Sequence, residues 1–173
     1  IYVSNATTGT TAFGRSNPEG LYWLSADSAA IASGTAGVTW GAGSGPWRSA
    51  VGSDGVLYVT DLSNDLAVEV AADLSGSVQL IDASNRTAAQ WVAGIQVTGT
   101  NAGGDRKIYL VNSNYNDTAR KGVIEYNLGA AAAVASGDTG TQIIGPSFFT
   151  FYPQDAVRDS AGNWYTGQYR SDP

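Results

Sequence analysis

The sequence predicts an all-β chain in which one small antiparallel sheet is repeated several times. Two observations lead to this prediction. A strand-like segment centred on a tyrosine recurs at nearly constant spacing, and turn-forming residues precede three of its four copies. The recurring tyrosines stand 56, 51 and 56 residues apart, at positions 2, 58, 109 and 165. Self-similarity at a fixed period of this size is typical of repeat architectures, in which each repeat is one supersecondary unit.

A tight turn and an apolar run lie upstream of three of these tyrosine segments. The turn sequences combine glycine with aspartate or asparagine, and they are Asp54-Gly55, Gly103-Gly104-Asp105 and Ala161-Gly162-Asn163. Such residues supply the positive φ that a hairpin turn requires. The apolar runs before them cover residues 50–51, 95–97 and 156–157. Each repeat therefore begins with a strand, a tight turn and a second, tyrosine-bearing strand.

Two further strands complete the repeat. The segments that follow the tyrosine strands resemble one another, and the candidate third strands lie within residues 20–34, 67–70 and 122–137. Short β-type stretches come next, and the candidate fourth strands lie within residues 38–40, 78–81 and 142–144. Each period thus holds about four short strands, which is the size of one propeller blade.

Four-stranded sheets repeated at this period are typical of a β-propeller. One small twisted sheet cannot cover both of its own faces, whereas sheets stacked around an axis bury the faces of their neighbours. The predicted fold is therefore a partial β-propeller of about three blades, each a four-stranded antiparallel sheet. The expected blades span residues 1–45 (second to fourth strands), 46–90, 91–145 and 146–173 (first two strands). The alternative is a β-sandwich whose strands are similar by chance.

The repeat also resembles known propeller repeats. Residues 46–65 and 153–168 are similar to NHL-type repeats, and residues 106–115 resemble the related YVTN-type repeats. The resemblance covers three blades loosely and two strands of each blade well. It implies a fold more than an activity, because the superfamily spans sugar lactonases, peptide-processing lyases, interaction scaffolds and bacterial surface proteins. The lyases of the family hold zinc with histidines, which this sequence lacks. Lactonase-like members bind calcium through carboxylates and asparagines at the mouth of the channel.

Composition excludes several classes of function. The 173 residues include 9 Lys and Arg against 15 Asp and Glu, which gives a net charge of −6. We therefore expect no nucleic-acid partner, because affinity for phosphate backbones comes mainly from basic residues. No apolar run approaches the ~20 residues that span a bilayer, so we expect no membrane insertion. The sequence holds no His and no Cys, which removes Ser–His–Asp triads, Cys–His pairs and Cys-based zinc sites.

The ends of the sequence lead to a further expectation. The chain contains no Met and begins with Ile1-Tyr2-Val3, which resembles the middle of a strand. We therefore expect a processed or truncated piece of a longer protein. Closed propellers usually need four to eight blades, so we expect remaining blades or other chains to complete the ring.

Propeller geometry predicts a ligand-binding surface. The connections from the fourth strand of one blade to the first strand of the next meet near the central channel, and concave sites of this kind commonly bind ligands. In this chain the connections carry aromatic, charged and amide side chains, namely Trp47, Arg48, Tyr152, Gln154 and Asp155. Asp155 stands where the earlier repeat has Ser49, so it is specific to its own blade. We predict that these five residues bind a protein or glycan ligand.

Oxygen-bearing side chains on the same face suggest a calcium site. Calcium takes six to eight oxygen ligands from carboxylates, amides and carbonyls. The candidate ligands are Asp61, Asn112 and Asp155, within a wider set that adds Asp65, Asn114 and Asp117. We favour a structural interpretation, because one repeat position carries Asn5, Asp61, Asn112 and Gln168. Asx side chains at strand ends often bind nearby backbone N–H groups and fix a turn.

Other carboxylates and several aromatic residues are further candidates for function. Asp155 and Asp159 would be the carboxylates for acid–base catalysis, but Asp159 lies next to a hairpin turn and we expect it to face the opposite side. The recurring tyrosines are expected to pack between blades. The segment Phe148–Tyr152 is the best candidate for an exposed patch, because four aromatic residues among five cannot all face one core.

The predicted function is that of a non-enzymatic binding module of a secreted or cell-surface protein, from a bacterium. Low charge, abundant small polar residues, the absence of sulfur and the lack of a coherent catalytic set support this prediction. One alternative is a calcium-assisted hydrolase or lactonase, with Asp61, Asn112 and Asp155 as ligands. Another is a structural assembly unit whose open blade edges pair with other chains, since unpaired edge strands readily add a strand.

Overall fold

A computed structural model describes residues 2–5, 20–23, 38–39, 45–71, 76–85, 91–113 and 119–169 of the chain. The regular structure in these ranges consists of β-strands and two short 3₁₀ turns, η2 (Ala83–Asn85) and η3 (Pro146–Phe148). No α-helix occurs among these residues. The described part of the chain accordingly holds no helix that is long and apolar enough to cross a membrane. The all-β prediction is confirmed.

The strands form four antiparallel sheets, and in each sheet they lie in chain order. The first sheet contains β1 (Tyr2–Asn5), β2 (Gly20–Trp23) and β3 (Val38–Thr39). The second contains β4 (Pro46–Val51), β5 (Leu57–Asp61), β6 (Leu66–Val70) and β7 (Ser77–Gln79). The third contains β8 (Val92–Thr98), β9 (Lys107–Asn112), β10 (Gly122–Asn127) and β11 (Thr141–Ile144). The fourth contains β12 (Tyr152–Arg158) and β13 (Trp164–Tyr169).

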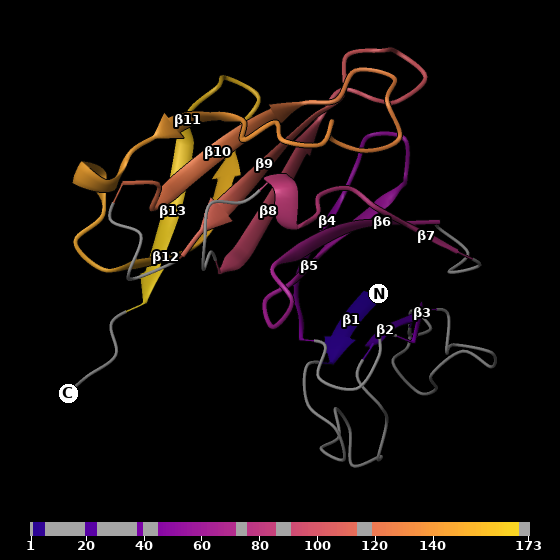
Figure 1. The fold of residues 1–173 in the computed structure, drawn as a ribbon, viewed down its shortest axis with the longest axis horizontal. Helices are drawn as coiled ribbons and strands as arrows, with labels where there is room; N and C mark the ends of the chain where they lie inside the picture. The colour runs from indigo at the N-terminus through magenta and orange to yellow at the C-terminus, as the bar shows by residue number, and fades with distance from the viewer. Residues whose placement is uncertain are drawn as a thin grey trace.

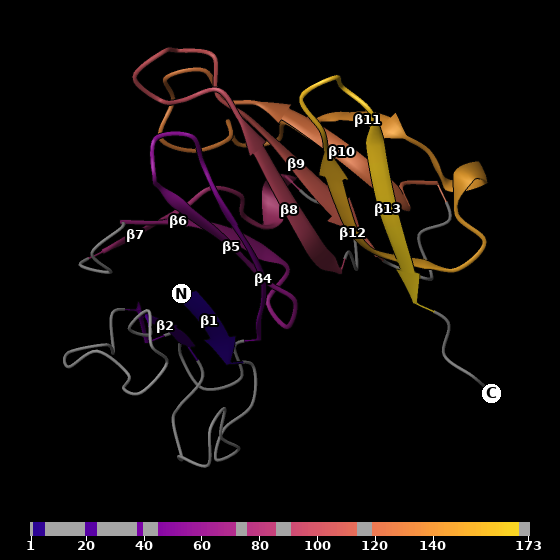
Figure 2. The same cartoon turned by 180° about the vertical axis from the view of Figure 1, so that it is seen from behind.

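The sheets follow one another across the molecule in chain order. In Figure 1 they run from β1–β3 at the lower right, through β4–β7, to β8–β11 and β12–β13 at the left, and Figure 2 shows the same order from behind. The first strands of successive sheets are neighbours, because β8 contacts both β4 and β12. None of the described sheets closes on itself. The repeated antiparallel sheet that the tyrosine spacing predicts is therefore present.

The hairpin turns have the chemistry that their sequences predict. Gly55 and Gly162 adopt φ angles of 81° and 91°, the left-handed region that glycine enters without a steric cost. The side chain of Asp54 accepts the N–H of Val56 at 3.2 Å. Such Asx hydrogen bonds fix a tight turn locally, so these residues join each first strand to its second.

Apolar side chains fill the spaces between successive sheets. The cluster between the second and third sheets consists of Tyr58, Ala67, Leu80, Ile81, Val92, Ile95, Val97, Ile108, Leu110, Ile124, Tyr126 and Leu128. A second cluster, between the third and fourth sheets, consists of Tyr109, Val111, Val123, Phe149 and Ala156. Neighbouring residues of β9 thus alternate between the two clusters, as the period of two in a strand requires. The third sheet is therefore buried on both faces.

A buried arginine links the second and third sheets. Arg106, just before β9, is fully buried and pairs with Glu69 of β6, and it also donates to the carbonyl oxygen of Ala131. Burial disfavours its charged form, but hydrogen bonds with Tyr58 and Glu69 outweigh this and hold the pKa of Arg106 above its ordinary value. A cation at this depth requires such partners, so Arg106 fixes how the two sheets meet.

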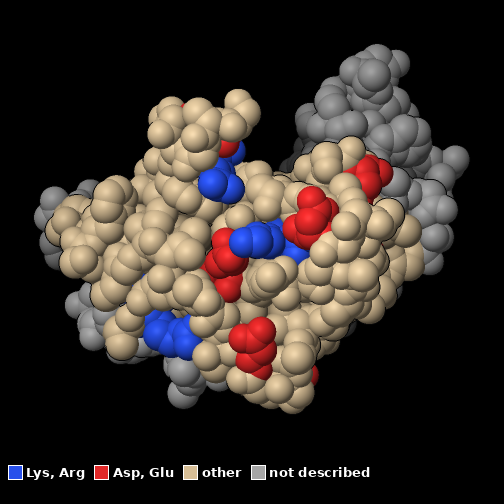
Figure 3. Space-filling model, turned by 90° about the horizontal axis from the view of Figure 1, so that it is seen from above, with Lys and Arg blue, Asp and Glu red and all other residues tan. Residues whose placement is uncertain are grey.

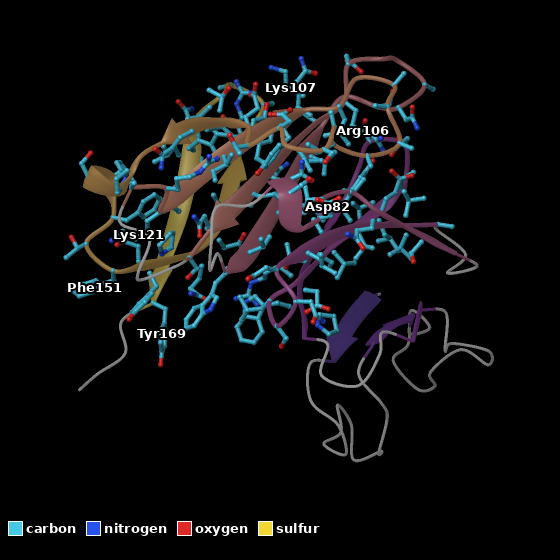
Figure 4. All side chains as sticks on the ribbon, viewed as in Figure 1. Asp82, Arg106, Lys107, Lys121, Phe151 and Tyr169 are labelled. Carbon is cyan, nitrogen blue, oxygen red and sulfur yellow. The ribbon has the colours of Figure 1, made fainter. Side chains whose placement is uncertain are left out.

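Acidic and basic side chains are interspersed on the side of the molecule where Arg106 pairs with Glu69. Arg106 and Lys107 are labelled near the top of Figure 4, and Figure 3 views the molecule from that side, where blue and red groups lie interspersed among tan surface. Lys107 pairs with Glu125 at 2.9 Å, and this hydrogen bond raises the pKa of Lys107.

The recurring tyrosines do not share one environment. Tyr58 and Tyr109 are 1% and 3% exposed and pack between sheets as expected, whereas Tyr165 is 58% exposed. The expectation of inter-sheet packing is therefore wrong for Tyr165. The physical reason is that no described residue covers the outer face of β13. The side chain of Tyr2 lies outside the described residues.

Candidate ligand-binding surface

Two first strands, β4 and β12, carry the predicted ligand-binding residues, and β8 lies between them. β4 carries Trp47 and Arg48, and β12 carries Tyr152, Gln154 and Asp155. Nε of Arg48 lies 3.7 Å from Oδ2 of Asp155, and both side chains are 44% exposed. Residues from two different sheets thus form one ion pair on the surface.

A small residue in the intervening strand permits this approach. A Cβ atom placed on Gly94 of β8 would lie 2.9 Å from Oδ1 and 3.0 Å from Cα of Asp155. A contact of 3.0 Å with the backbone is tighter than nearly all real Cβ contacts, so glycine at position 94 lets β12 approach β8 closely. Gly94 therefore sets the position of Asp155 relative to β8.

Each of the three first strands carries a β-bulge at the same place. The pairing register gains one extra residue between Pro46 and Ser49 in β4, between Val92 and Gly94 in β8, and between Pro153 and Asp155 in β12. A bulge bends its strand and re-aims the side chains within it. Trp47, Arg48 and Gln154 lie in these bulges, and so does the buried Ala93 of β8.

Aromatic rings stand at the start of each first strand. Trp91, directly before β8, stacks on Tyr152 with ring centres 6.4 Å apart and planes 20° apart. The guanidinium of Arg48 lies 5.3 Å from the centre of the Trp47 ring. Trp47 and Trp91 are 36% and 51% exposed, so both rings present area to solvent.

Hydrogen bonds fix the polar groups of this surface. Nε2 of Gln154 donates to Oγ of the buried Ser113 at 2.8 Å, and the N–H of Ser113 donates to the carbonyl of Trp91 at 2.7 Å. Oδ1 of Asp155 accepts the N–H of Ala156 at 2.9 Å. We call the set Trp47, Arg48, Trp91, Tyr152, Gln154 and Asp155 the first-strand surface.

The candidate calcium ligands have structural partners. Oδ1 of Asp61 accepts the N–H groups of Gly45, Ser63 and Asn64 at 2.8 to 3.0 Å, and its Oδ2 accepts Nδ2 of Asn64 at 2.9 Å. Nδ2 of Asn112 donates to the carbonyl of Arg120 at 3.0 Å. Both side chains are buried. The bonds of Asp61 to the N–H groups of Ser63 and Asn64 are those that the structural interpretation predicts, whereas Asn112 binds a carbonyl oxygen instead.

The repeat position of Asp61 and Asn112 marks the start of each bulge. In the pairing register Asp61 lies opposite Pro46, Asn112 opposite Val92, and Gln168 opposite Pro153. Oε1 of Gln168 accepts the N–H of Phe151 at 3.0 Å, much as Asp61 accepts that of Gly45. The polar side chains of Asp61 and Gln168 therefore bind the backbone that leads into the first strand, whereas Asn112 binds the backbone before β10.

The calcium site stays a prediction. Within the ranges that the structure describes, no three acidic side chains come together as metal ligands would. Of the wider set, Asp65 accepts the N–H of Val92 at 3.3 Å, whereas Asn114 and Asp117 lie outside the described residues.

Asp155 and Asp159 do not form a catalytic pair. Asp159 lies in the turn after β12, where its two oxygens accept the backbone N–H and Nδ2 of Asn163 at 2.8 and 2.9 Å. These hydrogen bonds lower the pKa of Asp159. Asp159 follows Asp155 by four positions, which corresponds to about 13 Å along an extended backbone. They face separate surroundings, as the sequence-based interpretation expects.

The aromatic segment Phe148–Tyr152 divides between core and surface. Phe149 is 3% exposed and belongs to the cluster between the third and fourth sheets, while Phe148 is 62% exposed. Tyr152 joins the first-strand surface. The segment is thus a partly exposed patch, and one of its rings fills the core.

The sequence-based prediction lacks one member of the first-strand surface and one buried residue that supports it. Trp91 and Ser113 were not among the predicted ligand-binding residues, although a signal for Trp91 exists in the repeat. An aromatic residue opens each first strand, as Trp47, Trp91 and Tyr152. The role of Ser113 depends on contact with Gln154 from another sheet, for which the local sequence carries no signal.

Comparisons with protein-family models, with curated proteins and with solved structures found no match to this chain.

Proposed function

We propose that this chain is part of a β-propeller related to the NHL and YVTN repeats. The support is architectural. Small antiparallel sheets follow one another in chain order, their first strands are neighbours, and the third sheet buries both faces against the sheets beside it. In a propeller the first strands are the innermost, so the first-strand surface would lie near the central axis.

The chain serves as a non-enzymatic binding module that takes a glycan at the first-strand surface, in a secreted or cell-surface protein. The observation that carries this proposal is the stacked pair of Trp91 and Tyr152 beside the ion pair of Arg48 and Asp155. Aromatic faces cover the apolar C–H faces of sugar rings. A neighbouring guanidinium and carboxylate offer donors and acceptors to sugar hydroxyls.

The polar groups of the surface are suited to recognition. Gln154 is held by Ser113, Asp155 by Arg48 and by a backbone N–H, so each side chain is oriented before a ligand arrives. Such pre-organisation lowers the entropic cost of binding. Rigid aromatic residues surrounded by oriented polar groups also form the centres of many binding sites.

The test is a titration with soluble oligosaccharides, for which cellohexaose, chitohexaose and xylohexaose serve as probes. Isothermal calorimetry should detect binding of at least one probe. Trp91→Ala should weaken that binding at least about tenfold. Phe148→Ala, which removes another exposed ring, from η3, should leave the affinity unchanged. Absence of binding by every probe at millimolar concentration would count against a glycan ligand.

A further inference from the structure

Three residues share one position of the repeat but differ in charge. Arg48, Gly94 and Asp155 each stand two residues after the one with which the bulge of its first strand begins. The first of them is a cation, the second has no side chain and the third is an anion. Nε of Arg48 and Oδ2 of Asp155 lie 3.7 Å apart. The ion pair thus joins two sheets across the first strand of the sheet between them.

The glycine in the middle leaves room for this pair. A Cβ atom on Gly94 would meet both Oδ1 and Cα of Asp155, at 2.9 and 3.0 Å. Asp155 therefore occupies space that a side chain of residue 94 would need. A larger residue at this position would require Asp155 to shift, and its carboxylate would then leave its place beside Arg48.

A buried hydroxyl group fixes the backbone below the pair. Oγ1 of Thr60 in β5 accepts the N–H of Arg48 at 3.1 Å and donates to the carbonyl oxygen of Ala93 at 3.0 Å. Thr60 is fully buried. Because one hydroxyl joins the bulges of β4 and β8, Arg48 keeps a fixed position relative to Gly94, against which Asp155 packs.

The paired groups remain able to bind a small polar group. Both side chains are 44% exposed, and their 3.7 Å separation is longer than the about 3.2 Å of a good N–H···O hydrogen bond. The Nε–H of Arg48 and the lone pairs of Oδ2 of Asp155 therefore do not saturate each other. A hydroxyl group can accept from a guanidinium and donate to a carboxylate at the same time. A sugar with two adjacent free hydroxyls presents two such groups.

A carboxylate group fits the same place poorly. The guanidinium of Arg48 attracts it, but the carboxylate of Asp155 stands beside that guanidinium. A second carboxylate has no proton to donate to Asp155, and like charges brought this close oppose binding strongly. The net charge of the chain, −6, adds a longer-range repulsion that salt screens. The local pair therefore discriminates between neutral and acidic groups.

We infer that the ligand of the first-strand surface is a neutral glycan with adjacent free hydroxyls, and that the Arg48–Asp155 pair rejects glycans that carry carboxylates. This inference rests on the proposed glycan-binding function and names its substrate class. The adjacent hydroxyls bind Arg48 and Asp155, while a sugar face packs on the rings of Trp91 and Tyr152. The rings contact neutral and acidic sugars alike, so the ion pair determines which of the two is bound.

The test compares probes of matched shape on the full chain by isothermal calorimetry. Cellohexaose is paired with its form oxidised to the carboxylate at C6, and xylohexaose with a form that carries glucuronic acid branches. The neutral member of a pair should bind at least about tenfold more tightly than the acidic member. Its affinity should change less than about twofold between about 0.05 and 0.5 M NaCl. Chitohexaose, in which an acetamido group replaces one of two adjacent hydroxyls, should bind more weakly than cellohexaose.

Two variants that remove the same charge locate the source of the rejection. Asp155→Asn removes the carboxylate beside Arg48, so the preference for the neutral probe should fall at least about threefold. Asp159→Asn is the matched control, because it removes an equal charge from the turn after β12, outside the first-strand surface. It should leave the preference unchanged.

The opposing outcomes separate this inference from the function on which it rests. If no probe of either kind binds at millimolar concentration, the glycan-binding function fails, and the inference fails with it. If an acidic probe or chitohexaose binds at least as tightly as the neutral probes with adjacent hydroxyls, the glycan-binding function stands and the substrate class is wrong. Equal effects of Asp155→Asn and Asp159→Asn would assign the rejection to the net charge of the chain and overturn the role of the pair.

Discussion

Replacement of Asp61 separates a structural role from calcium binding. Its carboxylate accepts four hydrogen bonds, three of them from the backbone N–H groups of Gly45, Ser63 and Asn64. Asp61→Ala removes every acceptor. Asp61→Asn keeps one oxygen that can accept the three backbone N–H groups, and it loses the charge and the bond from the side chain of Asn64. A structural role therefore predicts unequal effects of the two substitutions.

The sizes of the two effects follow from these bonds. The N–H of Gly45 is buried, and leaving such a donor unsatisfied costs about 1–3 kcal/mol. The other two donors are part-buried and partly reach water, so Asp61→Ala should cost about 2–4 kcal/mol in total. Asp61→Asn should cost about 1 kcal/mol. For a chain of this size, 1 kcal/mol lowers Tm by about 2–4 °C, which gives decreases of roughly 5–15 °C and 2–4 °C.

Thermal unfolding followed by circular dichroism measures both variants, with and without millimolar calcium. The structural role predicts that calcium leaves all Tm values unchanged. Two results would refute the reasoning. One is an Asp61→Asn variant as unstable as Asp61→Ala. The other is a calcium-dependent rise in Tm that the unaltered chain shows and both variants lack.

Three further predictions concern stability. Leu110→Ala should lower the free energy of unfolding by about 2–5 kcal/mol, because this side chain is buried between the second and third sheets. Urea unfolding measures this loss, and a value below about 1 kcal/mol would mean that the sheets do not pack together at Leu110. Arg106→Met should destabilise the fold because it leaves the carboxylate of Glu69 without its ion-pair partner. The double variant Arg106→Met with Glu69→Gln should recover most of this loss, whereas additive losses of the two single variants would show that the two side chains do not interact. The pKa of Asp159 is lowered from 3.8 by its bonds with Asn163, so its stabilisation is complete above that value and is lost as the pH falls through the lower folded-state pKa. The stability of Asp159→Asn should therefore decrease less between neutral and acid pH than that of the unaltered chain, as measured by thermal unfolding at each pH. The same pH dependence in both chains would show that the bonds with Asn163 do not stabilise the turn.

The repeat could be predicted from the sequence because its signals are local. The spacing of Tyr58 and Tyr109 and the turn residues before them depend only on neighbours along the chain, and both strands lie where these signals place them. The recurrence of a polar residue at the position of Asp61 also predicted bonds to backbone N–H groups, which Asp61 makes. Local pattern and repeat position thus determine the strands and their turns.

The details of the site could not be predicted because they depend on contacts between sheets. The bulges in the first strands, the close approach at Gly94 and the bond from Gln154 to Ser113 join residues that lie far apart in the sequence. Arg106 was also unexpected, since a lone arginine in a polar turn carries no sign that it will be buried. The exposure of Tyr165 could not be predicted either, because the sequence around it is similar to that around the buried Tyr58 and Tyr109. Tyr165 is exposed because no described residue covers it.

Tryptophan indole signals provide the most direct test of the proposed ligand surface. The chain has five tryptophans, and their indole N–H groups give resolved signals in a ¹⁵N-labelled NMR spectrum. Addition of an oligosaccharide that binds should shift the signals of Trp47 and Trp91, which are exposed on the first-strand surface. Trp164, which packs against Tyr109 between the sheets, should keep its position. Shifts confined to Trp164, or unchanged signals of Trp47 and Trp91 at saturation, would contradict the proposed surface.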